Sequence, residues 1–157
     1  MTAGIGWDSH RLAAGRPLIL GGVTIPHDRG LEGHSDADVL THAVIDALLG
    51  AAALGDIGQH FPDTDERYRD ADSMQLLRAV VTMLAERGLK VAHVDTTVVI
   101  ERPKLAGHRD AIRTSLAEGL GVEPAQVNVK ASTGEGMGFV GREEGVAALA
   151  VATLQAR

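Results

Sequence analysis

The sequence contains no cysteine and few aromatic residues, and none of its hydrophobic runs is long enough to cross a bilayer. The absence of cysteine excludes disulfides and thiolate metal ligands. Aromatic residues make up 3% of the 157 residues, which leaves few platforms for stacking nucleic-acid bases. The net charge of −6 has the same implication, because a protein that follows a phosphate backbone needs a basic face. The composition therefore predicts neither a nucleic-acid-binding protein nor a membrane protein.

The residues that are present suit one domain spanning residues 1–157. Hydrophobic residues account for 45% of the chain, but many of them are alanines, so the core is thin for its length. Burial of further surface between subunits would compensate, and we expect an oligomer. The chain begins with strand-like sequence and lacks the basic and apolar regions of a signal peptide. The expected location is the cytoplasm.

Hydrophobic periodicity predicts a mixed α/β fold with helices on one face of a sheet. Strands are expected over residues 5–12, 90–101 and 127–131, with a hairpin over 17–26 that turns at two glycines. Helices are expected after Ser35 as N-cap, over 73–87, and from Pro103 to Leu120. Residues 145–155 fit neither the helical nor the strand period clearly.

Three side chains form a candidate metal site. Asp8 and His10 are two residues apart, so they leave the same face of a strand. His42 falls in the second turn of the first predicted helix. Two imidazoles and one carboxylate suit zinc, and three protein ligands leave one coordination position open, as in catalytic zinc sites. Asp46, one turn further on, either accepts a hydrogen bond that fixes the His42 tautomer or lies on a solvated helix face.

Three other segments carry polar groups suited to a ligand. His34 and Ser35 precede the first predicted helix, whose backbone N–H groups could bind phosphate, although Ser35 is also expected to cap the helix. Residues 55–65 form a loop rich in glycine, aspartate and proline. Its acceptors and N–H groups could bind hydroxyls, but its composition alone favours an ordinary turn-rich surface loop. Residues 130–135 place hydroxyls and Glu135 at a strand end, where they could hold phosphate oxygens and a hard cation such as Mg²⁺, or simply form a tight turn.

Taken together, the motifs resemble those of the 2-C-methyl-D-erythritol 2,4-cyclodiphosphate synthase family, nearly from end to end. No single motif is specific, but their number, order and spacing are. The matching segments are Gly6-Trp7-Asp8-Ser9-His10, Gly21-Gly22-Val-x-Ile-Pro26, His34-Ser35-Asp36-x-Asp38, His42, Asp46-Ala-Leu-Leu-Gly50-Ala-Ala-Ala-Leu-Gly-Asp-Ile-Gly58, Phe61-Pro-Asp-Thr-Asp65, Ala71-Asp-Ser73, Pro103-Lys104, Val127-Asn-Val-Lys-Ala131 and Gly138-Phe-x-Gly141-Arg142-x-Glu144-Gly145.

This resemblance implies a cyclase. In that family, the 2-phosphate of 4-diphosphocytidyl-2-C-methyl-D-erythritol 2-phosphate attacks the β-phosphate of the same molecule, and CMP leaves. The implied fold is a ferredoxin-like mixed sheet with helices on one face, and the implied assembly is a homotrimer with active sites between subunits. The resemblance also implies that residues 145–155 form a strand.

The resemblance assigns roles to individual residues. Zn²⁺, or another divalent transition metal, is expected at Asp8, His10 and His42, and Mg²⁺ or Mn²⁺ at Glu135. His34 and Thr133 are the expected catalytic residues. The full set expected to contact substrate is Asp8, His10, His34, Ser35, Asp56, Ile57, Gly58, Phe61, Pro62, Asp63, Thr64, Asp65, Ile100, Glu101, Arg102, Pro103, Lys104, Leu105, Ala106, Ala131, Ser132, Thr133, Gly134, Glu135, Phe139 and Arg142.

Within this set, residues 56–65 match the methylerythritol-binding loop, and residues 100–106 with 131–133 match the cytidine pocket. Phe139, Arg142 and Glu144 match residues around a cavity on the trimer axis, which in some family members holds ligands resembling isoprenoid diphosphates. Two other functions use the same metal triplet. One is a zinc-dependent phosphohydrolase, and the other is a non-enzymatic trimeric binding module in which the metal is structural.

Overall fold

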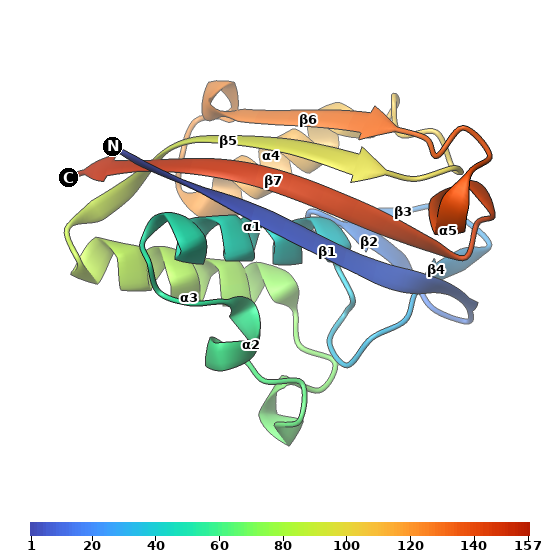
Figure 1. Cartoon of the computed structure of the whole chain (residues 1–157), viewed down its shortest axis with the longest axis horizontal. Helices are drawn as coiled ribbons and strands as arrows, with labels where there is room; N and C mark the ends of the chain where they lie inside the picture. The colour runs from blue at the N-terminus through green and yellow to red at the C-terminus, as the bar shows by residue number, and fades with distance from the viewer.

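The computed structural model describes all 157 residues, and its main feature is a five-stranded sheet (Figure 1). The elements, in chain order, are β1 (Thr2–Ala14), β2 (Leu18–Leu20), β3 (Val23–Ile25), β4 (Arg29–Leu31), α1 (Val39–Ala51), α2 (Ile57–His60), η1 (Glu66–Tyr68), α3 (Ser73–Glu86), β5 (Leu89–Val99), α4 (Arg109–Leu120), η2 (Pro124–Gln126), β6 (Val127–Ser132), α5 (Gly138–Gly141) and β7 (Gly145–Ala156).

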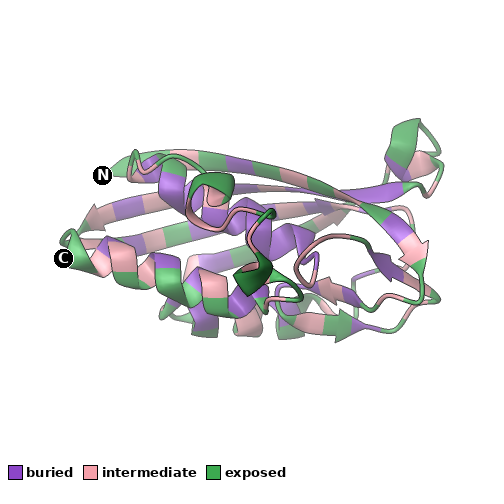
Figure 2. Ribbon diagram, turned by 90° about the horizontal axis from the view of Figure 1, so that it is seen from below, coloured by how far each residue is buried: buried purple, intermediate pink, exposed green.

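The large sheet has the strand order β4-β1-β7-β5-β6. Its central strands are antiparallel, and only β5 and β6 run parallel. The two ends of the chain therefore lie side by side in β1 and β7 (Figure 1). The long helices α1, α3 and α4 all cover one side of this sheet (Figure 2). This architecture confirms the predicted mixed α/β fold with helices on one face.

Glycine on β1 allows α1 to approach the sheet very closely. Even-numbered residues of β1 face the helices, and these include Gly4 and Gly6. A Cβ atom at Gly6 would fall 1.8 Å from the carbonyl oxygen of Ala43 in α1, and one at Gly4 would fall 2.1 Å from that of Ala47. The backbones of β1 and α1 are thus in contact where larger side chains would keep them apart, and α1 is almost entirely buried.

The opposite face of the sheet carries no long helix and exposes apolar side chains. Ile5 is 69% exposed, Trp7 53% and Val151 44%. Ile5 on β1 lies opposite Val151 on β7, and Trp7 lies opposite Leu149 in the same way. These side chains form a continuous apolar surface that a single chain leaves in contact with solvent.

Most predicted elements are present, with shifts at their boundaries. The hairpin at Gly21-Gly22, the helix from Ser73 and the strand at the C-terminal end are confirmed. The prediction that a helix starts at Pro103 is wrong: α4 begins at Arg109, because residues 101–108 form an irregular loop after β5. Gly121 ends α4 in the left-handed conformation, as its position predicted.

Candidate active site

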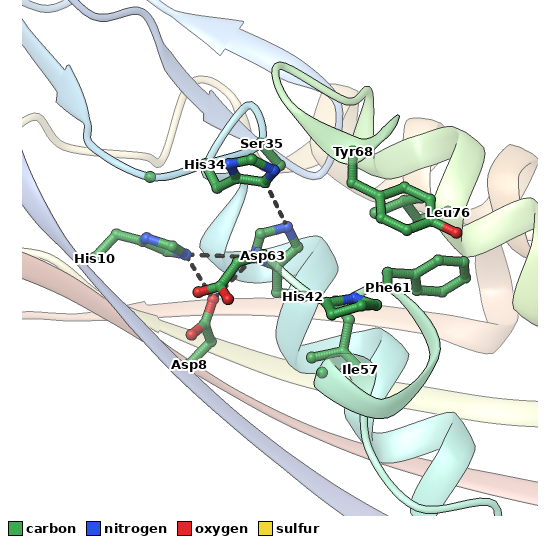
Figure 3. A pocket seen from close by; sticks show the side chains of 13 residues that line it. Asp8, His10, His34, Ser35, His42, Ile57, Phe61, Asp63, Tyr68 and Leu76 are labelled. Atoms are coloured by element: carbon green, nitrogen blue, oxygen red, sulfur yellow. Dashed lines mark hydrogen bonds and ion pairs between the residues drawn. The ribbon is translucent and has the colours of Figure 1, made fainter. Parts of the chain in front are cut away.

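The three predicted metal ligands converge in the structure. Asp8 and His10 come from β1 and His42 from α1, and one ligand atom from each lies within 4.8 Å of the others (Figure 3). The Asp8 Oδ2 atom is 2.9 Å from His10 Nε2 and 3.0 Å from His42 Nδ1, and the two nitrogens are 3.3 Å apart. The donor set and its spacing suit a divalent ion such as zinc.

The hydrogen bonds of Asp38 fix the start of α1, and thereby the position of His42. Asp38, a fully buried residue, is the N-cap of α1 and accepts a 2.9 Å hydrogen bond from the Thr41 N–H. The same carboxylate accepts hydrogen bonds from the N–H groups of Gly21 and Gly22, which tie the helix to the β2–β3 turn. The prediction of Ser35 as N-cap is wrong, and His42 therefore lies in the first turn rather than the second.

A hydrogen bond outside the metal triad (Asp8, His10 and His42) determines which nitrogen of His10 carries the proton. Its Nδ1 lies 2.9 Å from the carbonyl oxygen of Glu32. A carbonyl oxygen only accepts, so Nδ1–H is the donor and neutral His10 presents the Nε2 lone pair to Asp8. Lone pairs and a carboxylate that face one another repel unless a cation lies between them. The arrangement thus fits the donor requirements of a metal ion.

The triad also has distinctive electrostatics. Burial of the Asp8 carboxyl raises its pKa, but the hydrogen bonds and charge attraction that the protonated rings of His10 and His42 provide outweigh this and bring the pKa to about 2. Burial lowers the pKa of His10, but protonation of Nε2 lets this nitrogen donate a hydrogen bond to the Asp8 carboxylate, and that bond together with the negative charge of Asp8 raises the pKa of His10 overall. The carboxylate is therefore charged throughout the physiological range and attracts cations to this point.

The triad lies in a cavity of about 480 Å³. Polar residues, including His34 and Ser35, line one side, and apolar side chains line the other (Figure 3). Of the predicted loop, Ile57, Gly58, Phe61, Pro62 and Asp63 line this cavity, whereas Asp56, Thr64 and Asp65 do not. Asp56 instead caps α2, and the backbone oxygen of Asp65 contacts His34 Nε2 at 3.0 Å.

Sequence reasoning missed three residues of this cavity, namely Gly33, Tyr68 and Leu76. Tyr68 stacks edge-on against Phe61, with ring centroids 5.4 Å apart. Its place next to the motif that contains Phe61 was an available signal, since it is the only tyrosine in the chain. Leu76 belongs to the amphipathic pattern of α3 and carried no such signal.

Most of the second group of predicted residues line a separate cavity of about 400 Å³ at the ends of β5 and β6. Arg102 and Gly134 do not line it, and Arg109, which the sequence analysis missed, does. Its lining residues are Ile100, Glu101, Pro103, Lys104, Leu105, Ala106, Arg109, Ala131, Ser132, Thr133 and Glu135.

Two of the residues predicted for this cavity have other contacts. Arg102 points elsewhere and forms a bidentate ion pair with Glu143, both distances being 2.7 Å. The carboxylate of Glu101 accepts hydrogen bonds from the N–H groups of Gly134, at 2.8 Å, and Gly136, at 3.4 Å. It thereby holds the loop that presents Glu135.

The two cavities share no lining residue, so His34 and Thr133 are not brought together within one chain. Phe139 and Arg142 lie in neither cavity. Phe139 lines a small hollow at the end of the sheet, and Arg142 lies 3.3 Å from the Glu144 carboxylate.

Comparison with known proteins assigns the chain. The family model described as "YgbB family" matches residues 1–155. The chain belongs to this family. Among YgbB relatives, it is 63% identical over 155 residues to the 2-C-methyl-D-erythritol 2,4-cyclodiphosphate synthase of Salinibacter ruber, covering 99% of each chain. It is 59% identical over 157 residues to the enzyme of that name from Symbiobacterium thermophilum, covering all of both.

Solved structures share the fold of this chain. The bifunctional IspDF from Campylobacter jejuni superposes with a TM-score of 0.96 and 42% identity, over 99% of this chain; this chain spans 42% of that longer protein. A CDP-bound 2C-methyl-D-erythritol-2,4-cyclodiphosphate synthase superposes with a TM-score of 0.90 and 40% identity, covering 98% of this chain and 99% of the other. No helix in this chain has the length and apolar character needed to cross a bilayer.

Proposed function

We propose that this chain converts 4-diphosphocytidyl-2-C-methyl-D-erythritol 2-phosphate into 2-C-methyl-D-erythritol 2,4-cyclodiphosphate and CMP. The observation that carries the proposal is the convergence of Asp8, His10 and His42 at a cavity in a YgbB-family fold. Relatives that match nearly the whole chain are named for this activity. Isoprenoid biosynthesis is the corresponding pathway.

The proposed metal sites are two. Asp8, His10 and His42 would hold Zn²⁺ or another divalent transition metal, and Glu135 would contribute to a Mg²⁺ or Mn²⁺ site. When bound, these ions supply positive charge where the diphosphate accumulates negative charge. No lysine or arginine lines the triad cavity, so a metal ion would be the main source of positive charge for the phosphates there.

The protein groups orient the substrate and exclude water. His34 and Thr133 are proposed to contact the reacting phosphates, the first from the triad cavity and the second from the β5–β6 cavity. Apolar side chains such as Ile57 and Phe61 suit the carbon skeleton of methylerythritol. No general base is needed, because the attacking phosphate oxygen is already an anion.

We further propose a homotrimer in which each active site forms between two subunits. The triad and Glu135 line separate cavities of one chain, so a neighbouring chain would have to bring the second half of the site to the first. The exposed apolar surface around Trp7 supports this assembly, since oligomerisation would bury it.

The direct test incubates the protein with substrate, Zn²⁺ and Mg²⁺ in H₂¹⁸O. We expect release of CMP and a cyclic diphosphate without solvent oxygen, identified by ³¹P NMR and mass spectrometry. A linear product carrying ¹⁸O would instead identify a phosphohydrolase that uses the same triad. A His42→Ala variant that fails to fold, together with the absence of turnover in the parent, would identify a metal-stabilised binding module.

The shared site has a separate test. Asp8→Ala and Thr133→Ala chains are each expected to be inactive, because each lacks one half of every site. Refolded mixtures are expected to regain activity, since some interfaces then combine two intact halves. Absence of any recovery in mixed trimers verified by mass spectrometry would contradict sites between subunits.

A further inference from the structure

The second ring nitrogen of His42 contacts a pair of residues that lie outside the metal triad. His42 Nε2 is 2.7 Å from the hydroxyl of Ser73, the first residue of α3, which is fully buried. Ser73 Oγ in turn lies 2.5 Å from Asp36 Oδ1, and the Ser73 N–H donates to Asp36 Oδ2 at 3.0 Å. His42, Ser73 and Asp36 are thus linked by successive hydrogen bonds, on the side of the His42 ring opposite Asp8 and His10.

The donors and acceptors in this series of hydrogen bonds follow from the chemistry of the three side chains. A carboxylate accepts hydrogen bonds and donates none, so Ser73 must use its only hydroxyl proton on Asp36. The Ser73 oxygen then presents lone pairs to His42 and can only accept from it. His42 therefore carries its proton on Nε2, and Nδ1 is left with a lone pair directed at Asp8 and His10.

We propose that Asp36 and Ser73 are positioning residues that hold His42 in the tautomer competent for metal binding. Without them, the Asp8 carboxylate, 3.0 Å from Nδ1, would favour a proton on Nδ1 and so block the metal. The Ser35 hydroxyl already accepts a hydrogen bond from the Ala37 N–H and lies 3.3 Å from Nε2. It is therefore a weaker acceptor for Nε2 than Ser73, which lies 2.7 Å away. Through Ser73, these hydrogen bonds link the start of α3 to the proposed metal ligand His42 on α1.

This inference rests on the proposed metal site but not on the cyclisation reaction. Partners of the second ring nitrogen typically change metal affinity by about 10- to 100-fold when removed. We expect Ser73→Ala to weaken Zn²⁺ binding by this factor, as measured by competition with a chromophoric chelator. Ser73→Thr keeps the hydroxyl and is expected to restore the affinity to within about threefold. Ser115→Ala, on α4 and outside both cavities, is the matched control and leaves affinity unchanged.

The tautomer itself can be measured without metal. Long-range ¹H–¹⁵N correlation spectra of the metal-free parent protein, recorded at about pH 8, distinguish the two ring nitrogens and are expected to show His42 protonated on Nε2. A proton on Nδ1 would overturn the proposal, as would Zn²⁺ affinity within twofold of the parent in folded Ser73→Ala. If Ser73→Ala does not fold, or the parent binds no zinc, the spectrum of the parent still decides. A protein without cyclase activity would not affect either measurement, the His42 tautomer or the Zn²⁺ affinity of Ser73→Ala.

Discussion

Gly6→Ala tests whether close backbone contact is what builds the metal site. The new methyl group would fall 1.8 Å from the carbonyl oxygen of Ala43 in α1, whereas ordinary contact begins at 3.4 Å, so β1 and α1 must separate by about 1.6 Å (3.4 − 1.8). The obstacle is helix backbone, which cannot rotate aside as a flexible side chain can. Asp8 and His42 flank this contact on the strand and on the helix.

The expected cost follows from this displacement. Overpacking of a core costs about 1–3 kcal/mol, and we expect the upper end, about 3 kcal/mol in the free energy of unfolding, because the buried face of α1 must move as a unit. The 3.0 Å separation of His42 and Asp8 would lengthen by up to the same displacement. Metal sites tolerate changes of about 0.2 Å in ligand distance, so Zn²⁺ affinity is expected to fall by at least about 100-fold.

Urea unfolding at one fixed protein concentration, combined with zinc competition, measures both effects. Gly50→Ala is the matched control on the same helix, since its nearest neighbours would be 3.8 Å away. Alanine is favoured over glycine inside a helix by up to about 1 kcal/mol, so this variant is expected to be as stable as the parent or more so. A Gly6→Ala protein that unfolds within about 1 kcal/mol of the parent and binds zinc normally would refute the reasoning.

Two further predictions concern carboxylates that accept hydrogen bonds from backbone N–H groups. Asp38→Ala leaves the buried N–H groups of Gly21 and Thr41, and the partly buried N–H of Gly22, without an acceptor. It is expected to lower the free energy of unfolding by about 3–5 kcal/mol, and an unfolding midpoint equal to that of the parent would contradict this. Glu101→Gln should loosen the loop that presents Glu135 and raise the Mg²⁺ concentration for half-maximal activity about tenfold. An unchanged Mg²⁺ titration would count against that role, and zinc affinity serves as the internal control.

Much of the site was predictable because strand and helix periods are local properties. The two-residue spacing of Asp8 and His10 placed both side chains on one face of β1, and the structure confirms this. The residues of the second cavity follow one another along two neighbouring strand ends, so their proximity was also predictable. Arg102 departs from this set because Glu143, 41 residues away, binds its guanidinium.

The predictions that failed concern which group packs against a given face. Neither role considered for Asp46 is observed: it neither accepts a hydrogen bond from His42 nor lies on a fully solvated helix face. Its half-buried carboxylate accepts the Ile57 N–H at 2.7 Å, because α2 folds back onto α1 there. Ser35 has the chemistry of an N-cap, but the β2–β3 turn provides donors that hold Asp38 in that position instead. In both cases a segment distant in sequence supplied the deciding partner.

The sequence by itself determined the donor types, their shared strand face and the mixed α/β fold, since these depend on side-chain chemistry and short-range periodicity. Only the tertiary structure decided that Ser73 contacts His42, that glycine brings α1 against β1, and that the two halves of the proposed site lie in separate cavities. Those features depend on the packing of segments tens of residues apart, and the local pattern of the chain does not encode such distances.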